Sequence, residues 1–232
     1  MTTPPLPTET RLAVAAHLID SGCVTLRTDE PFRLPSGWAT PVYMDCRRLL
    51  SFPEARRTLV GHAVDALKAQ GCLSGAASVA GGESSGIALA AWIANALDLP
   101  MQYVRKRAAG SRQVEGVLRS GERVVLVDDM MAAGASKISF VQALRAAGAE
   151  VHDVLVLFDY KMFGADSLLA ALGLKVHALA TWHDIRAVAV RRGDFTTEAM
   201  AELNDFLRDP VAWSQAHGGK SSITSHIESN AS

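Results

Sequence analysis

The segment from Arg123 to Ser136 limits most strongly what this chain can fold into. Its apolar run, Val124 to Val127, predicts a strand buried on both faces of a parallel sheet. Asp128 and Asp129 follow directly, where such a strand should end. Carboxylates at that edge can bind sugar hydroxyls, or a magnesium ion through its water ligands. An acidic pair at a strand end also occurs in purely structural roles, so the pair does not identify a site by itself.

A loop of small residues, Met130 to Ala135, separates the acidic pair from the next predicted helix. Ser136 is expected to cap that helix, which spans Lys137 to Ala147. Backbone N–H groups and the dipole at a helix N-terminus attract anions, so this loop is expected to bind a phosphate. The chain has no G-x-x-x-x-G-K-[ST] sequence, which disfavours a Walker-type site. A response-regulator acid pocket would lie near the start of its domain, whereas more than half of this chain precedes the pair.

Length and charge restrict the class of protein. The 232 residues suffice for one domain with its own core. With a net charge of −1, the chain has no excess of basic residues that would attract nucleic acid. No apolar run approaches the ~20 residues that span a bilayer, and the N-terminus lacks signal-peptide features. Cys23, Cys46 and Cys72 show no C-x-x-C spacing, and His177 and His183 are expected to be packing or surface residues. We therefore expect a cytoplasmic protein with reduced thiols and without a membrane or nucleic-acid partner.

Alternating strand and helix patterns predict an α/β fold with a central parallel sheet flanked by helices. Besides the strand before the acidic pair, the predicted sheet strands are Ala76–Ala80, Pro100–Arg105, Val151–Phe158 and Lys175–Thr181. A hairpin from Val24 to Leu34 is expected ahead of them. One domain should span residues 1–217, with an N-terminal part over about 8–50 and a core over about 51–217. Residues 218–232 are rich in Ser and Gly and are expected to form a disordered tail.

Two further segments could bind anions. The turn from Gly81 to Gly86, G-G-E-S-S-G, joins a strand to a helix and would let a pyrophosphate approach the backbone closely. It lacks the G-x-G-x-x-G spacing of a dinucleotide site. The segment could also be a simple tight turn that binds no ligand. Four cations lie around the small segment Ala108 to Ser111, namely Arg105, Lys106, Arg107 and Arg112. Alone, this second segment could be a solvated loop.

These motifs, in this order, resemble those of the orotate phosphoribosyltransferases, which belong to the type I phosphoribosyltransferase family. The family pattern S-G-x-x-[ST]-P-x-Y-x-D-x-R is matched between Pro35 and Arg48 at Ser36, Gly37, Thr40, Pro41, Tyr43, Asp45 and Arg47. The resemblance implies the type I phosphoribosyltransferase fold, with residues 8–50 as a small hood over the site. It implies transfer of the phosphoribosyl group of 5-phosphoribosyl 1-diphosphate (PRPP) to orotate, giving orotidine 5′-monophosphate and pyrophosphate in pyrimidine synthesis. It also implies Mg²⁺ as cofactor and a homodimer with shared active sites.

The resemblance further implies roles for individual residues. The catalytic residues would be Asp128, Asp129 and Lys106, with the acids at the ribose hydroxyls. PRPP would contact Glu83, Ser84, Ser85, Arg105, Lys106, Asp128, Asp129, Met130, Met131, Ala132, Ala133, Gly134, Ala135 and Ser136. Orotate would contact Ser36, Gly37, Tyr43, Met44 and Ala132. Magnesium would have no direct protein ligand, being held by PRPP and reaching Asp128 and Asp129 only through water.

The chain also departs from the family pattern. Ala132 and Ala135 replace the usual hydroxyl residues, which should weaken phosphate binding by about 0.5–1.5 kcal/mol for each lost hydrogen bond. Ala108 and Ala109 occupy a mobile loop that usually carries a second Lys and often a His, and Phe158 to Lys161 lacks an Arg that some members use for orotate. Two hypotheses follow: an active enzyme, or a non-catalytic paralogue that binds PRPP or a nucleotide as a regulator. The retained hood, acidic pair and loop cations favour the enzyme, and the hood disfavours a purine transferase.

Overall fold

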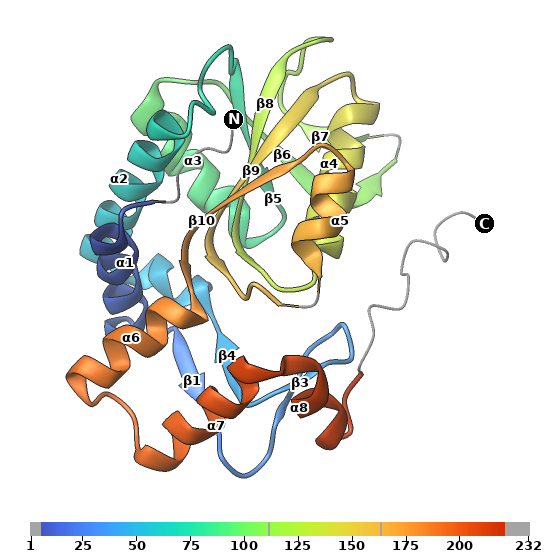
Figure 1. The fold of residues 1–232 in the computed structure, drawn as a ribbon. Helices are drawn as coiled ribbons and strands as arrows, with labels where there is room; N and C mark the ends of the chain where they lie inside the picture. Colours follow the sequence, from blue (N-terminus) through green and yellow to red (C-terminus); the bar gives the residue numbers. More distant parts are fainter. Residues whose placement is uncertain (1–5, 111, 163, 221–232) are drawn as a thin grey trace.

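A computed structural model describes residues 6–110, 112–162 and 164–220 of the chain. Its centre is a six-stranded sheet with the strand order β10-β9-β8-β5-β6-β7 (Figure 1). The strands are β5 (Ser78–Gly82), β6 (Met101–Ala109), β7 (Arg112–Glu115), β8 (Arg123–Met131), β9 (Glu150–Asp159) and β10 (Lys175–Thr181). Neighbouring strands are parallel, except that β7 runs antiparallel to β6. The predicted parallel α/β sheet is therefore confirmed.

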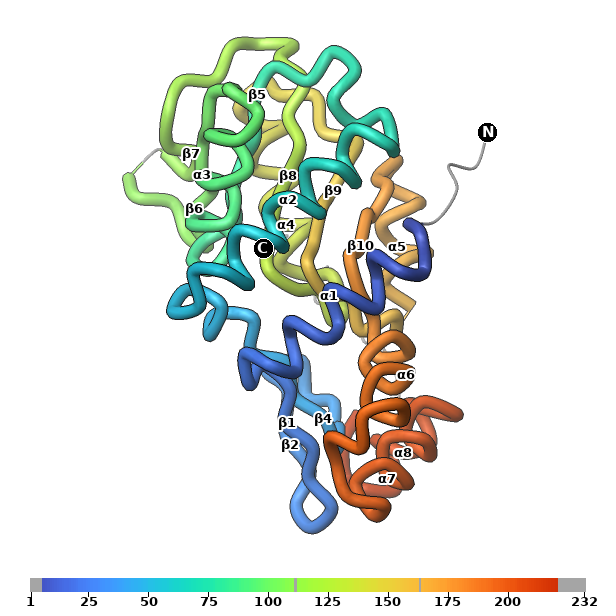
Figure 2. The backbone as a smooth tube through the Cα atoms, turned by 90° about the vertical axis from the view of Figure 1, so that its left-hand side faces the viewer, coloured from blue at the N-terminus to red at the C-terminus, as the bar shows by residue number. Residues whose placement is uncertain are grey.

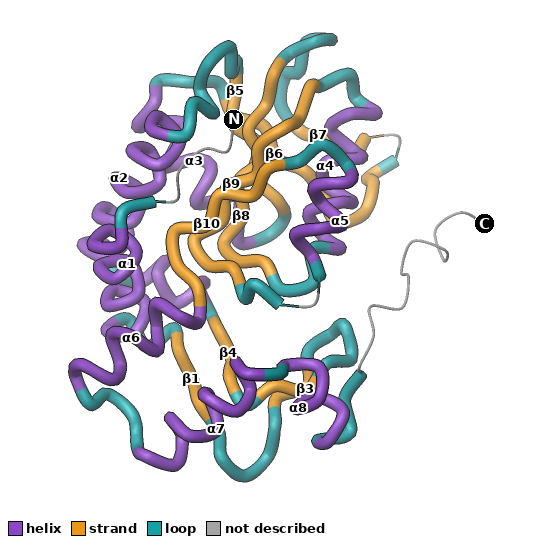
Figure 3. Tube along the Cα trace, in the orientation of Figure 1, coloured by secondary structure: helices purple, strands orange, loops and turns teal. Residues whose placement is uncertain are grey.

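Helices cover both faces of the sheet (Figures 1 and 3). One face carries α1 (Thr8–Asp20), α2 (Pro53–Ala69) and α3 (Ser85–Leu97), and the other carries α4 (Ala135–Ala146) and α5 (Ala165–Ala171). Strand β8 supplies alternate side chains to two apolar clusters, because Val125 and Val127 pack on one face and Val124 and Leu126 on the other. All four are at most 1% exposed. This explains the uninterrupted apolar run, since a strand buried on both faces has no polar face.

The hood lies beyond the carboxyl ends of the strands and forms a separate lobe (Figure 2). It contains the short strands β1 (Val24–Leu26), β2 (Phe32–Arg33), β3 (Ala39–Thr40) and β4 (Val42–Met44), followed by the 3-10 helix η1 (Cys46–Ser51). The predicted hairpin from Val24 to Leu34 is wrong, because β1 pairs with β4 and β2 pairs with β3. The alternation of apolar and polar residues identified the strands. The left-handed turn at Gly37 (φ +89°) reverses the chain so that β3 pairs with β2.

The C-terminal helices α6 (Trp182–Arg192), α7 (Thr197–Arg208) and α8 (Pro210–Ala216) lead from β10 to the hood (Figure 1). The buried Ser214 hydroxyl accepts a hydrogen bond from the Ala39 N–H at 3.0 Å and donates one to the Lys220 carbonyl at 2.7 Å. The Lys220 N–H donates to the Gly37 carbonyl at 3.0 Å. The start of the predicted tail therefore packs on the hood, whereas residues 221–232 lie outside the described residues. Among the described helices, none has the length and apolar character needed to cross a membrane.

Candidate active site

The predicted phosphate loop lies between β8 and α4, with boundaries that differ from the prediction. Met130 and Met131 belong to β8, and Ala135 is already the first residue of α4. The N-cap is Gly134, in the left-handed region (φ +79°), so the prediction that Ser136 caps the helix is wrong. Because the described residues provide no side-chain cap here, the first N–H groups of α4 remain free to bind an anion.

The two acids at the end of β8 occupy different environments. Both oxygens of Asp128 are engaged inside the protein, since Oδ1 accepts the Asp129 N–H at 2.9 Å and Oδ2 lies 2.5 Å from the Lys137 ammonium. The side chains of Asp128 and Lys137 are only 8% and 6% exposed. The Lys137 ammonium also lies 3.3 Å from the Ser136 hydroxyl. One buried cation thus contacts both Asp128 and Ser136, at the two ends of the predicted phosphate loop.

Sequence reasoning missed Lys137, although a signal was present. Lys137 shares the buried face of α4 with Val141 and Leu144, which follow at four and seven residues. A lysine on an apolar helix face needs an anionic partner, and an acidic pair lies just before the helix. The sequence could have suggested this contact, but not which of the two acids makes it.

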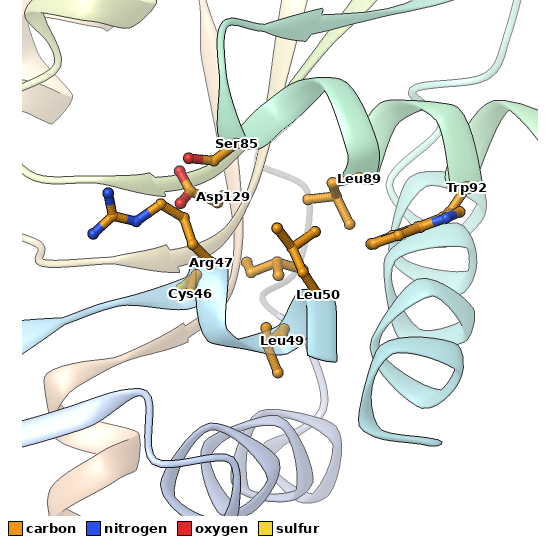
Figure 4. A pocket seen from close by; sticks show the side chains of 9 residues that line it. Cys46, Arg47, Leu49, Leu50, Ser85, Leu89, Trp92 and Asp129 are labelled. Carbon is orange, nitrogen blue, oxygen red and sulfur yellow. The ribbon is translucent and has the colours of Figure 1, made fainter. Parts of the chain in front are cut away.

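Asp129 faces a small pocket together with Ser85 and Arg47 (Figure 4). Its Oδ1 accepts the Met130 N–H at 2.8 Å. Burial raises the pKa of Asp129 to about 6, and repulsion from the Asp128 carboxylate adds to this shift. The Lys137 ammonium opposes it without cancelling it.

The remaining lining of this pocket is mostly apolar and comes from η1, α3 and β9, with Cys46, Leu49, Leu50, Leu89, Trp92 and Leu157. Figure 4 shows Leu50, Leu89 and Trp92 on the side away from Asp129. Asp129 is therefore an acid at the polar end of an otherwise apolar pocket. Such a group is held partly desolvated, which agrees with its raised pKa.

The predicted pyrophosphate turn packs directly against the acidic strand end. Ser84 is the N-cap residue of α3, and Glu83 accepts the Lys106 N–H at 2.7 Å through Oε2. A Cβ atom at Gly86 would lie 2.6 Å from the Val127 carbonyl and 2.9 Å from Asp128 Oδ1. Only glycine fits that contact, because β8 and the start of α3 approach each other so closely. The structure therefore brings together the turn, the acidic pair and the phosphate loop.

The predicted mobile loop is largely a β-hairpin. Strand β6 continues through Ala109, and Ala109 lies opposite Arg112, the first residue of β7. Ser111 lies outside the described residues. Arg105 was expected to contact PRPP, but its guanidinium Nε lies 2.9 Å from Glu115 Oε1 across the hairpin. The Lys106 side chain is exposed, on the neighbouring residue of the strand.

Of the predicted orotate residues, Ala132 lies in the loop between β8 and α4, and the other four are divided between two parts of the hood. Ser36 and Gly37 lie in the turn between β2 and β3, whereas Tyr43 and Met44 lie on β4, just before the pocket residue Cys46. The Met44 N–H donates to the Tyr160 hydroxyl at 3.1 Å, which joins the hood to the chain just beyond β9.

Arg47 matches the hood pattern and lines the pocket, although it was not predicted as a site residue. Its Nε lies 2.6 Å from Asp45 Oδ1, and an Nη donates to the Tyr43 hydroxyl at 3.4 Å. The Asp45 contact, together with its negative charge, raises the pKa of Arg47. These contacts hold the guanidinium beside Asp129 (Figure 4).

Comparisons with known proteins agree with this geometry. Residues 77–163 match the sequence model of the phosphoribosyl transferase domain. The chain is 42% identical to an orotate phosphoribosyltransferase from Dinoroseobacter shibae over 88% of this chain and 92% of the relative. A second, from a Ruegeria species, is 41% identical over the same two shares, 88% and 92%.

Solved structures show the same similarity. Leishmania donovani UMP synthase superimposes with a TM-score of 0.78 and 29% identity, over 87% of this chain and 43% of that chain. The orotate phosphoribosyltransferase of Aeropyrum pernix superimposes with a TM-score of 0.63 and 34% identity, over 78% of this chain and 99% of that chain.

Proposed function

The chain belongs to the orotate phosphoribosyltransferases. From the contacts within the chain, we propose which residues bind each part of the substrates. The enzyme transfers the phosphoribosyl group of PRPP to orotate, which gives orotidine 5′-monophosphate and pyrophosphate. The observation that carries the proposal is the unequal environment of the two acids at the end of β8. Asp128 is neutralised by Lys137 inside the protein, whereas Asp129 faces the pocket beside Ser85 and Arg47.

In this proposal Asp129 is the acid that meets the ribose. The C1–O bond to pyrophosphate breaks, the C1–N1 bond to orotate forms and orotate releases its N1 proton to solvent, through a state in which the ribose ring carries positive charge. A carboxylate in a partly desolvated pocket stabilises that charge more strongly than one in water. The 5′-phosphate binds the free N–H groups at the start of α4, from Gly134 to Ser136. Departing pyrophosphate binds the turn Glu83 to Ser85, and the exposed Lys106 side chain, contributed by the partner in the homodimer inferred below, supplies positive charge.

Lys137 serves as a positioning residue for this loop. It connects the strand end at Asp128 to the helix start at Ser136, and therefore fixes the loop at both ends. This contact offsets the hydroxyl groups that Ala132 and Ala135 lack. A loop held from inside needs fewer contacts from the substrate to adopt its binding conformation.

Orotate binds beneath the hood, and Mg²⁺ accompanies PRPP. The hood residues Tyr43 and Met44 are held near the pocket by Arg47 and Tyr160, which supports orotate contacts there. Asp129 would meet Mg²⁺ only through the water ligands of the ion, whereas the Asp128 oxygens are engaged elsewhere. When bound together with PRPP, Mg²⁺ would supply positive charge for the leaving group. The three cysteines are free thiols, which supports the expected cytoplasmic location.

The direct test is turnover by the purified wild-type chain. Orotate absorbance should fall when PRPP and Mg²⁺ are added, at a rate proportional to the enzyme concentration, and an established orotate phosphoribosyltransferase serves as control. PRPP binding by calorimetry without turnover would favour the non-catalytic regulator. The relatives reported above are named as enzymes, and nothing in them supports that alternative.

The raised pKa of Asp129 predicts an acidic limb in the pH profile. Asp129 is a carboxylate above about pH 6 and a neutral acid below it, so kcat/KM should fall as the pH decreases through about 6. The profile is measured under saturating Mg²⁺. In the Asp129→Asn variant, the residual activity should lose this limb because the titrating group is gone. A flat wild-type profile down to pH 5 would contradict the assignment.

Replacing Lys106 by Ala should raise the KM for PRPP about 10- to 100-fold, because a charged hydrogen bond to the diphosphate contributes about 1.5–3 kcal/mol. The matched control is Lys175→Ala, which removes an exposed cation at the opposite end of the sheet.

We also infer a homodimer in which Lys106 reaches the partner's active site. Mixed dimers of Lys106→Ala and Asp129→Asn should then recover some activity. No recovery in dimers proven to be mixed would rule out the shared site.

A further inference from the structure

Cys72, Asp153 and His177 form a buried cluster far along the strands from the acidic pair. Cys72 follows α2, Asp153 lies near the start of β9, and His177 lies near the start of β10. These are the amino ends of parallel strands, whereas the proposed active site lies at the carboxyl ends. Their residues are 1%, 5% and 9% exposed, respectively. Nothing in the phosphoribosyl transfer proposed above uses them.

The three donor atoms converge on one point. His177 Nε2 lies 2.9 Å from Asp153 Oδ1 and 3.3 Å from Cys72 Sγ. All three ligand atoms lie within 4.8 Å of one another. A catalytic Cys–His–Asp relay would use both ring nitrogens of the histidine, one for each partner. Here both partners contact the same nitrogen, so that all three donor atoms face one another, as the ligands of one ion would.

The distances and donor types fit zinc. Zinc bonds of about 2.3 Å to sulfur and about 2.0–2.1 Å to nitrogen and oxygen place tetrahedral neighbours about 3.3–3.6 Å apart. The observed separations of 2.9 and 3.3 Å are slightly shorter, so small side-chain rotations would admit the ion. One sulfur, one imidazole nitrogen and one carboxylate oxygen suit a borderline metal, whereas Mg²⁺ and Ca²⁺ prefer oxygen alone.

Arg123 supports the cluster from outside. One Nη donates to Asp153 Oδ2 at 3.0 Å, which leaves Oδ1 directed toward His177. The other donates to the Ser74 carbonyl at 2.8 Å, in the loop just after Cys72. Hydrogen bonds of this kind orient metal ligands. A thiolate and a carboxylate would balance the charge of a divalent ion.

We propose that Cys72, Asp153 and His177 bind a divalent transition-metal ion of the zinc type, with water as the fourth ligand. The metal–sulfur bond forms as the Cys72 S–H bond breaks, and the proton is released to solvent. The ion ties the connection between α2 and β5 to strands β9 and β10. Because its ligands lie away from the Asp129 pocket, the ion would take no part in phosphoribosyl transfer.

Cobalt(II) is a suitable probe because its thiolate complexes absorb in the near ultraviolet. Wild-type protein is treated with chelator, dialysed into excess Mg²⁺ and titrated with Co²⁺. We expect one equivalent to bind with a thiolate-to-cobalt band, and Zn²⁺ to displace it and raise the melting temperature. Cys72→Ser should lose both the band and the stabilisation. Cys23→Ser is the matched control and should keep both, because Cys23 is also a fully buried thiol but lies outside the cluster.

Absence of the band in folded wild-type protein would overturn the proposal and leave a hydrogen-bonded cluster. Persistence of the band in Cys72→Ser would also overturn it, by assigning the metal to another thiol. If Cys72→Ser does not fold, His177→Asn replaces it, and an unchanged band there has the same meaning. The wild-type titration needs no variant and no turnover, so its result does not depend on the proposed reaction.

Discussion

Replacing Asp129 by Asn should lower kcat by about 10²-fold, because the neutral amide cannot stabilise positive charge that develops on the ribose. The substitution keeps the shape of the side chain, so the pocket with Ser85 and Arg47 should persist. The KM for PRPP should change less than kcat, since the lost interaction is strongest in the transition state. Steady-state orotate consumption, measured over a range of PRPP concentrations at saturating orotate and Mg²⁺, gives both parameters.

The matched control for this variant is Asp166→Asn. Asp166 is an exposed acid in α5, paired with Lys161 outside the pocket, and its replacement should leave kcat within about twofold of wild type. Unchanged turnover in Asp129→Asn would remove Asp129 from the mechanism. Asp128 would then be the next acid to test.

Replacing Lys137 by Met should lower the free energy of unfolding by about 3–5 kcal/mol, because it leaves the Asp128 carboxylate buried without its cation. The loop between Asp128 and Ser136 would also lose its internal support, so the KM for PRPP should rise. Urea unfolding measures the first effect and steady-state kinetics the second. Arg208→Met is the control, because it breaks an exposed ion pair with Asp205 and should cost less than about 1 kcal/mol.

A double variant separates charge burial from loop support. Lys137→Met combined with Asp128→Asn removes both charges, so its loss of stability should be smaller than that of Lys137→Met alone. The raised KM for PRPP should remain, because the neutral pair cannot hold the loop as firmly. If Lys137→Met has wild-type stability and KM, the buried ion pair has no part in positioning the loop.

The central sheet was predictable because its signals are local. The apolar run before Asp128 has no polar face, and such a pattern fits a strand covered on both sides. The separate roles of the two acids in the site could not be predicted in the same way. That Asp128 turns inward while Asp129 faces the pocket depends on the side-chain contact with Lys137, which belongs to another element. Sequence spacing brings the two acids together but does not distinguish their roles.

Pairing in the hood and in the hairpin was harder to predict, for the same physical reason. Strand alternation gives the faces of β1 and β2 but not their partners, and the turn at Gly37 decides the pairing. The small residues Ala108 and Ala109 were predicted as loop because they lack strand propensity. They extend β6 because β7 lies opposite, with Ala109 paired to Arg112.

The contacts of Ser214 and Lys220 with the hood have a consequence for synthesis of the protein. Ala39 and Ser214 are separated by 175 residues, so this part of the hood acquires its partner only when nearly the whole chain has been made. On the ribosome, the sheet can assemble before α8 has been synthesised and can pack against the hood. Nascent chains that stop before α8 should therefore fold a central sheet yet lack the contacts of Ser214 and Lys220 with the hood. Only chains that extend to Lys220 can make them.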